Sequence, residues 1–291
     1  SMLVATRFGS TAQLHRVAAP GAARVQLTFF DEPVAGAVVR PGTSEFVFAR
    51  DVGGDEYYQG FARGLTGTEA QITEPGTRNS GFEFSRDGAL LTWSRAGKGD
   101  PDYDIMVMTP GRPETRRVAL EGKGAMAPLE VSPDGRRVLV GNAISNVEAE
   151  LHLLDLASGR LTEIRPTEGA IRYDGGAFTA DGRSVITVSD EGADVPQLVR
   201  IDLADGKRTV LVPGLKWDVE GFDLSEDGSL LAYSVNEDGL STVRLMEVGN
   251  GRALKAPALP AGVLTGLKFS PDGRRLAIGL SAATATGDVY S

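Results

Sequence analysis

The sequence predicts an all-β fold made of small antiparallel sheets, and three observations lead to this prediction. First, a turn of the Ser-Pro-Asp-Gly type lies between two alternating apolar segments at five places in the 291 residues. Second, the glycines of these turns follow one another at intervals of 47, 47, 46 and 45 residues. Third, another set of glycines recurs between them with nearly the same period. A period of this length indicates a repeat architecture.

The first set of glycines marks a hairpin that is buried on one face. Apolar residues alternate on both sides of the turn, and the glycine is suited to the left-handed position that closes a short loop. A degenerate copy, VVRPGTSEFVF, adds one more turn upstream. The six turn glycines are Gly42, Gly88, Gly135, Gly182, Gly228 and Gly273.

The second set of glycines closes a second hairpin in each repeat. Each follows an apolar segment such as LHLLDLASG or LVRIDLADG, and precedes a polar segment with a few apolar residues, which we interpret as an outer strand. Two hairpins in roughly 46 residues are the content of one blade of a β-propeller, and this regular spacing disfavours a two-sheet sandwich. These glycines are Gly21, Gly67, Gly111, Gly159, Gly206 and Gly251.

The two ends of the chain determine the expected number of blades. Residues 3–28 supply strands two to four of a first blade, with LVAT as the second strand. Residues 263–291 supply the inner hairpin of a last blade, and DVYS begins its third strand. We therefore expect one propeller domain over residues 1–291, with seven four-stranded units of which the terminal two are incomplete. The alternative is a six-bladed ring closed by the N-terminal strands and the C-terminal hairpin, which leaves a surplus strand. Because a cut blade has an unpaired edge, we expect the chain to be a fragment.

Composition and charge exclude several classes of function. The formal net charge is −9, which repels phosphate backbones, so we expect no nucleic-acid partner. No apolar segment approaches the roughly 18 residues of a membrane span. There is no cysteine and there are only two histidines, so a thiolate or multi-histidine metal site is excluded. No phosphate loop or dinucleotide fingerprint occurs, and we expect no cofactor. The acidic segment DPDYD (100–104) lacks the glycine and the glutamate of a calcium-binding EF-hand loop.

Several segments resemble the propeller of the prolyl oligopeptidase family of serine peptidases. They are FSPDGRRLAI, LHLLDLASGRLTEI, TRFGSTAQLHRV, ARDVGGDEYYQ, WDVEGFDLSEDG and SVNEDGLS, and the last four are most similar to bacterial acylaminoacyl-peptidase or dipeptidyl-peptidase-type members. The resemblance implies an additional α/β-hydrolase domain with a Ser-Asp-His triad. This chain has no Gly-x-Ser-x-Gly motif, since GLSAA ends at Ala283, and His15 and His152 occupy third-strand positions. We therefore expect no catalytic residue in this chain, while the parent protein would be a serine hydrolase.

The resemblance also implies a role for the propeller. It would cover the hydrolase active site, admit short peptides or acyl-peptides, and hold the substrate terminus with charged side chains. In each blade the loop between strands two and three lies at the same end as the connection to the next blade, and these loops are the longer and more varied ones. We expect this end to meet the hydrolase domain. The candidate substrate-facing residues are Arg50, Asp51, Asp55, Glu56, Glu237 and Asp238.

Two other functions remain open. One is a stand-alone periplasmic propeller that binds a protein partner, like the propeller of the Tol envelope system. The other is a propeller enzyme, such as a lyase or a glycosidase, which requires convergent acids or a metal in its channel. Only the peptidase interpretation predicts a further domain of some 250 residues with a nucleophile motif. The sequence does not distinguish a cytoplasmic from a periplasmic bacterial protein.

Overall fold

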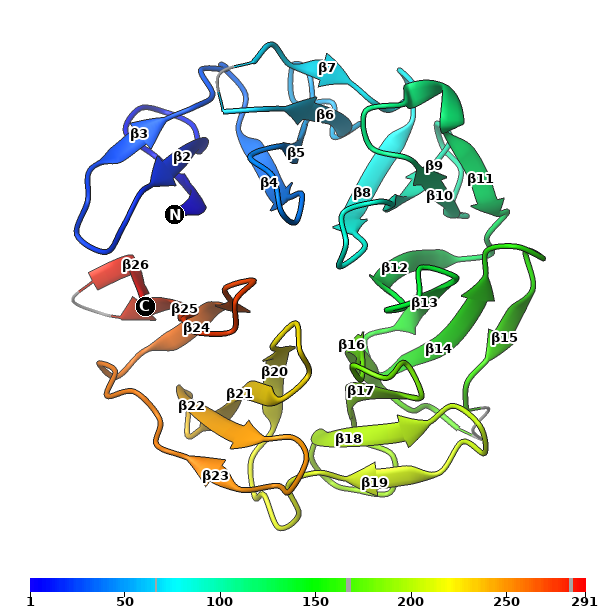
Figure 1. Cartoon of the computed structure of the whole chain (residues 1–291), viewed down its shortest axis with the longest axis vertical. Coiled ribbons are helices and arrows are strands. Elements are labelled where there is room, and N and C mark those ends of the chain that lie inside the picture. The colour runs from blue at the N-terminus through cyan, green and yellow to red at the C-terminus, as the bar shows by residue number, and fades with distance from the viewer. Residues whose placement is uncertain (66, 166–168, 283–284) are drawn as a thin grey trace. The chain divides into compact units, whose positions relative to one another are not determined.

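The computed structural model describes residues 1–65, 67–165, 169–282 and 285–291, and these form an all-β, seven-bladed propeller (Figure 1). Neighbouring strands of blades 1, 2, 3, 5, 6 and 7 pair in antiparallel register, and each sheet is a meander of consecutive strands. The N-terminal and C-terminal strands form two separate three-stranded sheets, so the prediction of seven units with incomplete terminal blades is confirmed. The six-bladed alternative is wrong.

The strands of each blade follow one another along the chain. Blade 1 consists of β1 (Met2–Thr6), β2 (Gln13–Val17) and β3 (Arg24–Gln26), and blade 2 of β4 (Val34–Val39), β5 (Phe46–Arg50), β6 (Gln59–Arg63) and β7 (Ala70–Gln71). Blade 3 consists of β8 (Arg78–Phe84), β9 (Leu91–Ala96), β10 (Asp104–Met108) and β11 (Arg117–Leu120), blade 4 of β12 (Ala125–Val131), β13 (Arg137–Ser145), β14 (Glu148–Asp155) and β15 (Leu161–Glu163), and blade 5 of β16 (Tyr173–Phe178), β17 (Ser184–Ser189), β18 (Gln197–Asp202) and β19 (Arg208–Val210). Blade 6 consists of β20 (Val219–Leu224), β21 (Leu230–Glu237), β22 (Leu240–Glu247) and β23 (Ala253–Leu254), and blade 7 of β24 (Val263–Phe269), β25 (Leu276–Ala282) and β26 (Ala285–Tyr290).

The chain divides into two compact units. Unit 1 contains Ser1–Val131, Gly135–Asn142 and Leu154–Leu161, and unit 2 contains Ser132–Asp134, Ala143–Leu153 and Thr162–Ser291. Blades 1 to 3 belong to unit 1, blades 5 to 7 belong to unit 2, and blade 4 contributes residues to both. No described helix is long and apolar enough to cross a membrane; the 3₁₀ helix η1 (Pro113–Thr115) has three residues.

The Asp-Gly turns have one recurrent hydrogen-bond pattern. In blade 3 the Ser85 hydroxyl donates to Asp87 Oδ1 at 2.6 Å, and the same oxygen accepts the N–H of Ala89 at 3.0 Å. Gly88 has φ +67°, the left-handed conformation predicted from the sequence. These hydrogen bonds lower the pKa of Asp87, because they stabilise its carboxylate. The turns of blades 5, 6 and 7 repeat the pattern with Thr179–Asp181, Ser225–Asp227 and Ser270–Asp272.

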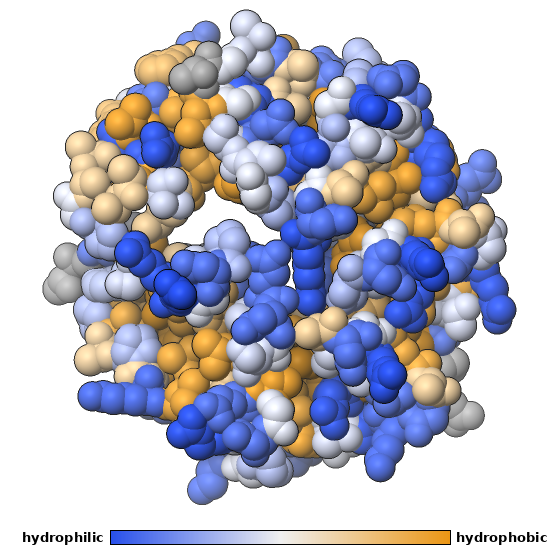
Figure 2. Space-filling view, in the orientation of Figure 1, coloured by the Kyte–Doolittle hydropathy of each residue, from blue (hydrophilic) through white to orange (hydrophobic). Residues whose placement is uncertain are grey.

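Within each unit, the core consists of apolar side chains between neighbouring blades. The cluster between blades 2 and 3 contains Trp93, which is fully buried, stacks on Phe82 at 5.9 Å and donates from Nε1 to Asn79 Oδ1 at 3.1 Å. Gly60 is required there, because a Cβ at this position would lie 2.5 Å from the ring of Phe82. The surface is mixed, and Figure 2 shows hydrophobic residues interspersed with hydrophilic ones over the face in view.

Each blade has two distinct ends. The loop end carries the loop between the second and third strands and the connection to the next blade, whereas the turn end carries the two tight hairpins. The register of blade 2 illustrates this, since Phe46 pairs with Arg63 at the turn end and Arg50 pairs with Gln59 at the loop end. The predicted candidate residues therefore all belong to loop ends.

Candidate interaction surface at the loop ends

Arg50 lies at the end of β5 and is held between two aromatic rings. Its guanidinium carbon is 4.3 Å from the centroid of Phe30 and 4.6 Å from that of Phe61, both within cation–π distance. Its Nε is buried and has no hydrogen-bond partner among the residues that the structure describes. The Arg50 side chain is therefore fixed by packing against the blade and is not freely extended into solvent.

The next three candidates belong to the loop 51–58, where one of them is structural. Asp51 is only 4% exposed, and its Oδ2 accepts the N–H of Glu56 at 3.1 Å. This bond holds Glu56 in a left-handed conformation with φ 61°, which is uncommon for a residue with a side chain. Asp55 Oδ1 accepts the N–H of Tyr57 at 2.9 Å. As a result, Asp55 and Glu56 are exposed at the tip of the loop, while Asp51 shapes it.

The remaining two candidates lie in unit 2, at the loop end of blade 6. Glu237 is the last residue of β21 and forms an ion pair with Arg244 of the next strand. Asp238 follows it with φ 54° and is exposed, and the N–H of Gly239 donates to Asn236 Oδ1 at 2.9 Å. The structure thus brings Arg50, Asp51, Asp55 and Glu56 together in one loop and Glu237 and Asp238 together in one hairpin.

Glu191 holds the long loop of blade 5 in place. Arg165 donates to both of its carboxylate oxygens at 2.7 and 2.6 Å, and the Tyr173 hydroxyl lies 3.3 Å from Oε2. The hydrogen bonds from Arg165 lower the pKa of Glu191, whereas burial and the nearby carboxylate raise the pKa of Tyr173 to about 12. This cluster ties the 190–196 loop to the start of β16.

In unit 1, the strands β2, β6 and β10 take the third-strand position of blades 1, 2 and 3. The first residue of each of these strands anchors the connection to the next blade. Gln13 Nε2 donates to the carbonyl oxygens of Phe30 and Glu32, both at 3.0 Å. Gln59 Nε2 donates to the Thr77 carbonyl at 2.6 Å, and Asp104 Oδ1 accepts the Gly122 N–H at 3.3 Å. Sequence reasoning missed these anchors, although a polar residue opens the third strand in all three blades.

The carboxylates of the DPDYD segment have structural partners. Asp102 accepts the Gly124 N–H at 2.7 Å and pairs with Lys123, and Asp104 pairs with Arg95. In the described parts of the chain, no three His, Asp or Glu side chains come together as a potential metal site. His15 lies in β2, which takes the third-strand position of blade 1, and His152 lies in β14, the third strand of blade 4, as the sequence predicted.

The exposed large apolar side chains are concentrated at the loop ends. Trp217 is 47% exposed, whereas Trp93 and Tyr233 are buried. Among the residues that the structure describes, eight exposed large apolar side chains belong to loop ends, against one at a turn end, Val39, and three on outermost strands. In unit 1 the loop-end group is Phe8, Phe29 and Val52, and in unit 2 it is Ile144, Val147, Trp217, Leu240 and Val263.

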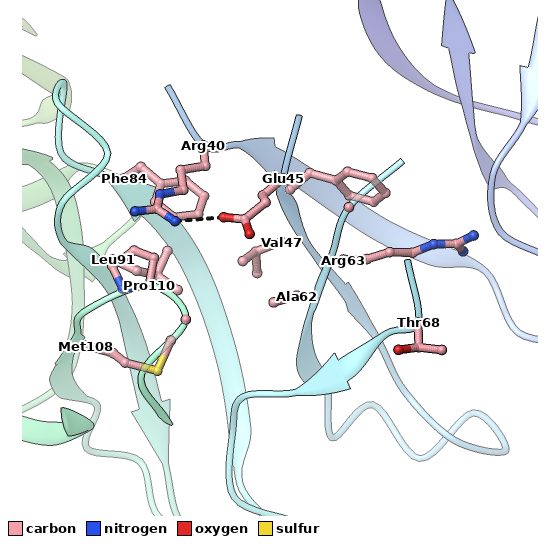
Figure 3. A pocket seen from close by; sticks show the side chains of 13 residues that line it. Arg40, Glu45, Val47, Ala62, Arg63, Thr68, Phe84, Leu91, Met108 and Pro110 are labelled. Carbon is pink, nitrogen blue, oxygen red and sulfur yellow. Dashed lines mark hydrogen bonds and ion pairs between the residues drawn. The ribbon is translucent and has the colours of Figure 1, made fainter. Parts of the chain in front are cut away.

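The sequence did not predict a cavity at the turn end of blades 2 and 3. It has a volume of about 170 Å³ and is lined by Val47, Ala62, Phe84, Leu91 and Met108, with Arg40 and Glu45 at one side (Figure 3). Arg40 Nη1 pairs with Glu45 Oε2 at 2.7 Å. This cavity lies at the end of blade 2 away from the 51–58 loop, so it is separate from the predicted substrate-facing residues.

The fold is similar to that of several solved propellers. A prolyl endopeptidase, from a study of two such enzymes and their inter-domain dynamics, has 20% identity and a TM-score of 0.74, and the match covers 97% of this chain and 43% of that one. TolB from Acinetobacter baumannii has 18% identity and a TM-score of 0.63, covering 84% of this chain and 60% of that one. An oligogalacturonate lyase in complex with manganese has 13% identity and a TM-score of 0.78, covering 99% and 84%.

These similarities establish the fold. The chain spans less than half of the length of the prolyl endopeptidase. No protein-family model matches the chain, and no curated protein matches its sequence.

Proposed function

We propose that this chain is the substrate-selecting propeller domain of a serine peptidase, without catalytic residues of its own. The parent enzyme would act on short peptides or acyl-peptides, as acylaminoacyl-peptidase or dipeptidyl-peptidase-type enzymes do. A catalytic α/β-hydrolase domain would pack against the loop ends of the blades. The observation that carries this proposal is the concentration of exposed apolar side chains at those ends.

The physical argument concerns burial. Exposed apolar residues scattered singly are normal, but a bias of such residues toward the loop ends of several blades supports a surface that another protein covers. Burying apolar area contributes about 25 cal/mol per Å², so side chains such as Phe29 and Trp217 supply much of the energy of such a contact. The similarity to a prolyl endopeptidase more than twice as long is consistent with a partner domain in the same polypeptide.

The exposed loop-end carboxylates support the substrate class. Asp55, Glu56 and Asp238 are exposed, whereas Asp51 and Arg50 are committed to the structure of their loop. Of the six candidates, these three are therefore free to hold a positively charged group. Of the two substrate classes, a peptide with a free amino terminus suits them better than an acyl-peptide.

The first test is the reading frame that encodes this chain. We expect it to encode, after residue 291, an α/β-hydrolase domain with a Gly-x-Ser-x-Gly motif. A frame that ends within one more hairpin would contradict the proposal. It would favour the second candidate, a propeller that binds a separate protein through the same apolar side chains.

The second test uses the full-length enzyme and a graded series of peptides. The double variant Asp55→Asn/Glu56→Gln should lower kcat/KM about tenfold for peptides with a free amino terminus, since a charge-assisted hydrogen bond contributes about 1.5 kcal/mol. The acetylated peptides should be unaffected. Asp205→Asn, the same change at an exposed turn end, is the matched control. Equal losses for both peptide series would show that these carboxylates do not select the substrate.

A further inference from the structure

The cavity between blades 2 and 3 exists because blade 2 has a short side chain where other blades have long ones. The residues of blades 3 and 6 that correspond to Val47 of blade 2 can be identified from the backbone hydrogen bonds that close the turn between the first and second strands. The N–H of Arg40 donates to the carbonyl of Glu45, as that of Ser85 does to Leu90 and that of Ser225 does to Leu230. Two residues further along each second strand stand Val47, Thr92 and Ala232.

The residues paired with these three differ in size. Thr92 pairs with Val107 and Ala232 pairs with Leu245, whereas Val47 pairs with Ala62. In blade 5, Ile186 pairs with Arg200 at the same position. Ala62 is therefore the smallest of the four, and Figure 3 shows that it and Val47 point into the cavity from adjacent strands.

The wall of the cavity is mostly apolar, and the polar residues Arg40, Glu45, Arg63 and Thr68 lie at its sides. Phe84, Leu91 and Met108 of blade 3 form the wall opposite Ala62, and all three are at most 7% exposed. Arg40 is paired with Glu45 and donates from Nε to the Gly88 carbonyl at 2.9 Å. The guanidinium of Arg63 points away from the cavity in Figure 3 and donates to the Leu27 carbonyl at 2.6 Å.

We propose that this cavity is a binding site for the apolar part of a small, uncharged ligand. Its volume of about 170 Å³ is close to the roughly 150 Å³ of an apolar cavity that binds benzene in another protein, although this cavity opens to solvent on one side. A single ring or a short branched chain therefore fills it. An ionised group would have to compete with the Arg40–Glu45 pair, and its desolvation would not be compensated. The site is independent of the proposed peptidase role, because it lies at the opposite end of the blades.

The test measures binding of 4-fluorobenzyl alcohol to the whole chain by fluorine NMR. We expect saturable line broadening with a Kd of about 1 mM, the range for a ligand with so few heavy atoms. Ala62→Leu introduces the residue found at position 245, so it should abolish the broadening and raise Tm by about 2–4 °C. Ala253→Leu, the same change on an exposed strand of blade 6, should leave binding intact.

Three results would overturn the proposal. They are the absence of saturable broadening with the unmodified chain, unchanged binding in Ala62→Leu, and equally tight binding of 4-fluorobenzoate. If Ala62→Leu does not fold, Ala62→Val takes its place, with the side chain found at position 107 in blade 3. Because the readout is direct binding, failure here leaves the peptidase proposal untouched, and the converse also holds.

Discussion

Gly122 lies in the connection from blade 3 to blade 4, and replacing it with alanine should strongly destabilise the protein. A Cβ at this position would overlap the carbonyl oxygen of Tyr103 and lie 3.5 Å from the amide nitrogen of Asp104. Both contacts are with backbone atoms of the blade 3 loop, which cannot rotate away as the end of a side chain can. The Gly122→Ala variant must therefore separate the two segments.

The cost can be worked out from the hydrogen bonds that join these segments. The N–H of Gly122 donates to Asp104 Oδ1 at 3.3 Å, that of Gly124 to Asp102 Oδ1 at 2.7 Å, and that of Tyr103 to the Gly124 carbonyl at 3.0 Å. Each contributes about 1 kcal/mol, so the loss is about 3 kcal/mol. For a chain of this size, about 2–4 °C of Tm corresponds to 1 kcal/mol, which gives a decrease of about 6–12 °C.

Thermal unfolding followed by circular dichroism tests this expectation against a matched variant. Gly221 lies in β20, where a Cβ would meet nothing within 4 Å, and its φ is not in the left-handed range. Gly221→Ala should therefore change stability by no more than about 0.5 kcal/mol. If Gly122→Ala and Gly221→Ala melt at the same temperature, the contact with Tyr103 is not rigid and the reasoning is refuted.

Three further predictions concern ionisable groups. The Ser225 hydroxyl lowers the pKa of Asp227, so the Asp227 carboxylate stabilises the fold above about pH 4. This stabilisation is lost as pH falls through the lowered pKa. In urea titrations, Asp227→Ala should therefore lose less stability on acidification than the unmodified chain. Arg165→Met leaves the partly buried Glu191 without its main partner, with Arg208 still 3.8 Å away, and should cost about 2 kcal/mol; an unchanged midpoint in urea would contradict this. Tyr173, with a pKa of about 12, contributes to the stability of the fold below about pH 10, and this contribution is lost as pH rises toward 12. In a titration of tyrosine ionisation by absorbance at 295 nm, Tyr173→Phe should lack the component that ionises at the highest pH.

The repeated hairpins could be predicted from the sequence, because one local feature determines each of them. All six glycines of the first set have positive φ, and so do Gly21, Gly111, Gly159, Gly206 and Gly251 of the second set. The predicted LVAT strand is β1, although the last strand begins at Ala285, before the predicted DVYS. A turn that requires a left-handed residue restricts the sequence strongly, so its period is visible without any structure.

Blade 2 shows why the cavity could not be predicted. Counting back five residues from the second-set glycine aligns Ala62 with Met106, but the pairing in the structure makes Val107 its counterpart. A shift of one residue moves a strand position to the other face of its sheet, so the glycine period alone cannot assign faces.

The positions of the six loop-end candidates could be predicted from the sequence, but their individual roles could not. Their location followed from the order of strands, but their individual roles depend on contacts between distant residues. Arg50 is packed between Phe30 and Phe61, and Asp51 is buried against the Glu56 amide. Charge and sequence position do not distinguish these two from the exposed Asp55, because the distinction depends on tertiary packing. The role of all six as substrate-facing residues stays a prediction.

The glutamine anchors of blades 1 and 2 have a consequence for engineering. Gln13 and Gln59 hold the backbone of the interblade connections, and neither depends on the side chains at the tips of the adjoining loops. The residues at the loop tips can therefore be replaced without changing the backbone course of the connections between blades. Libraries that vary Val52 and Asp55, and retain both amides and the left-handed residues Gly53, Gly54 and Glu56, should yield folded proteins with new ligand preferences, so the same framework can be used for unrelated recognition tasks.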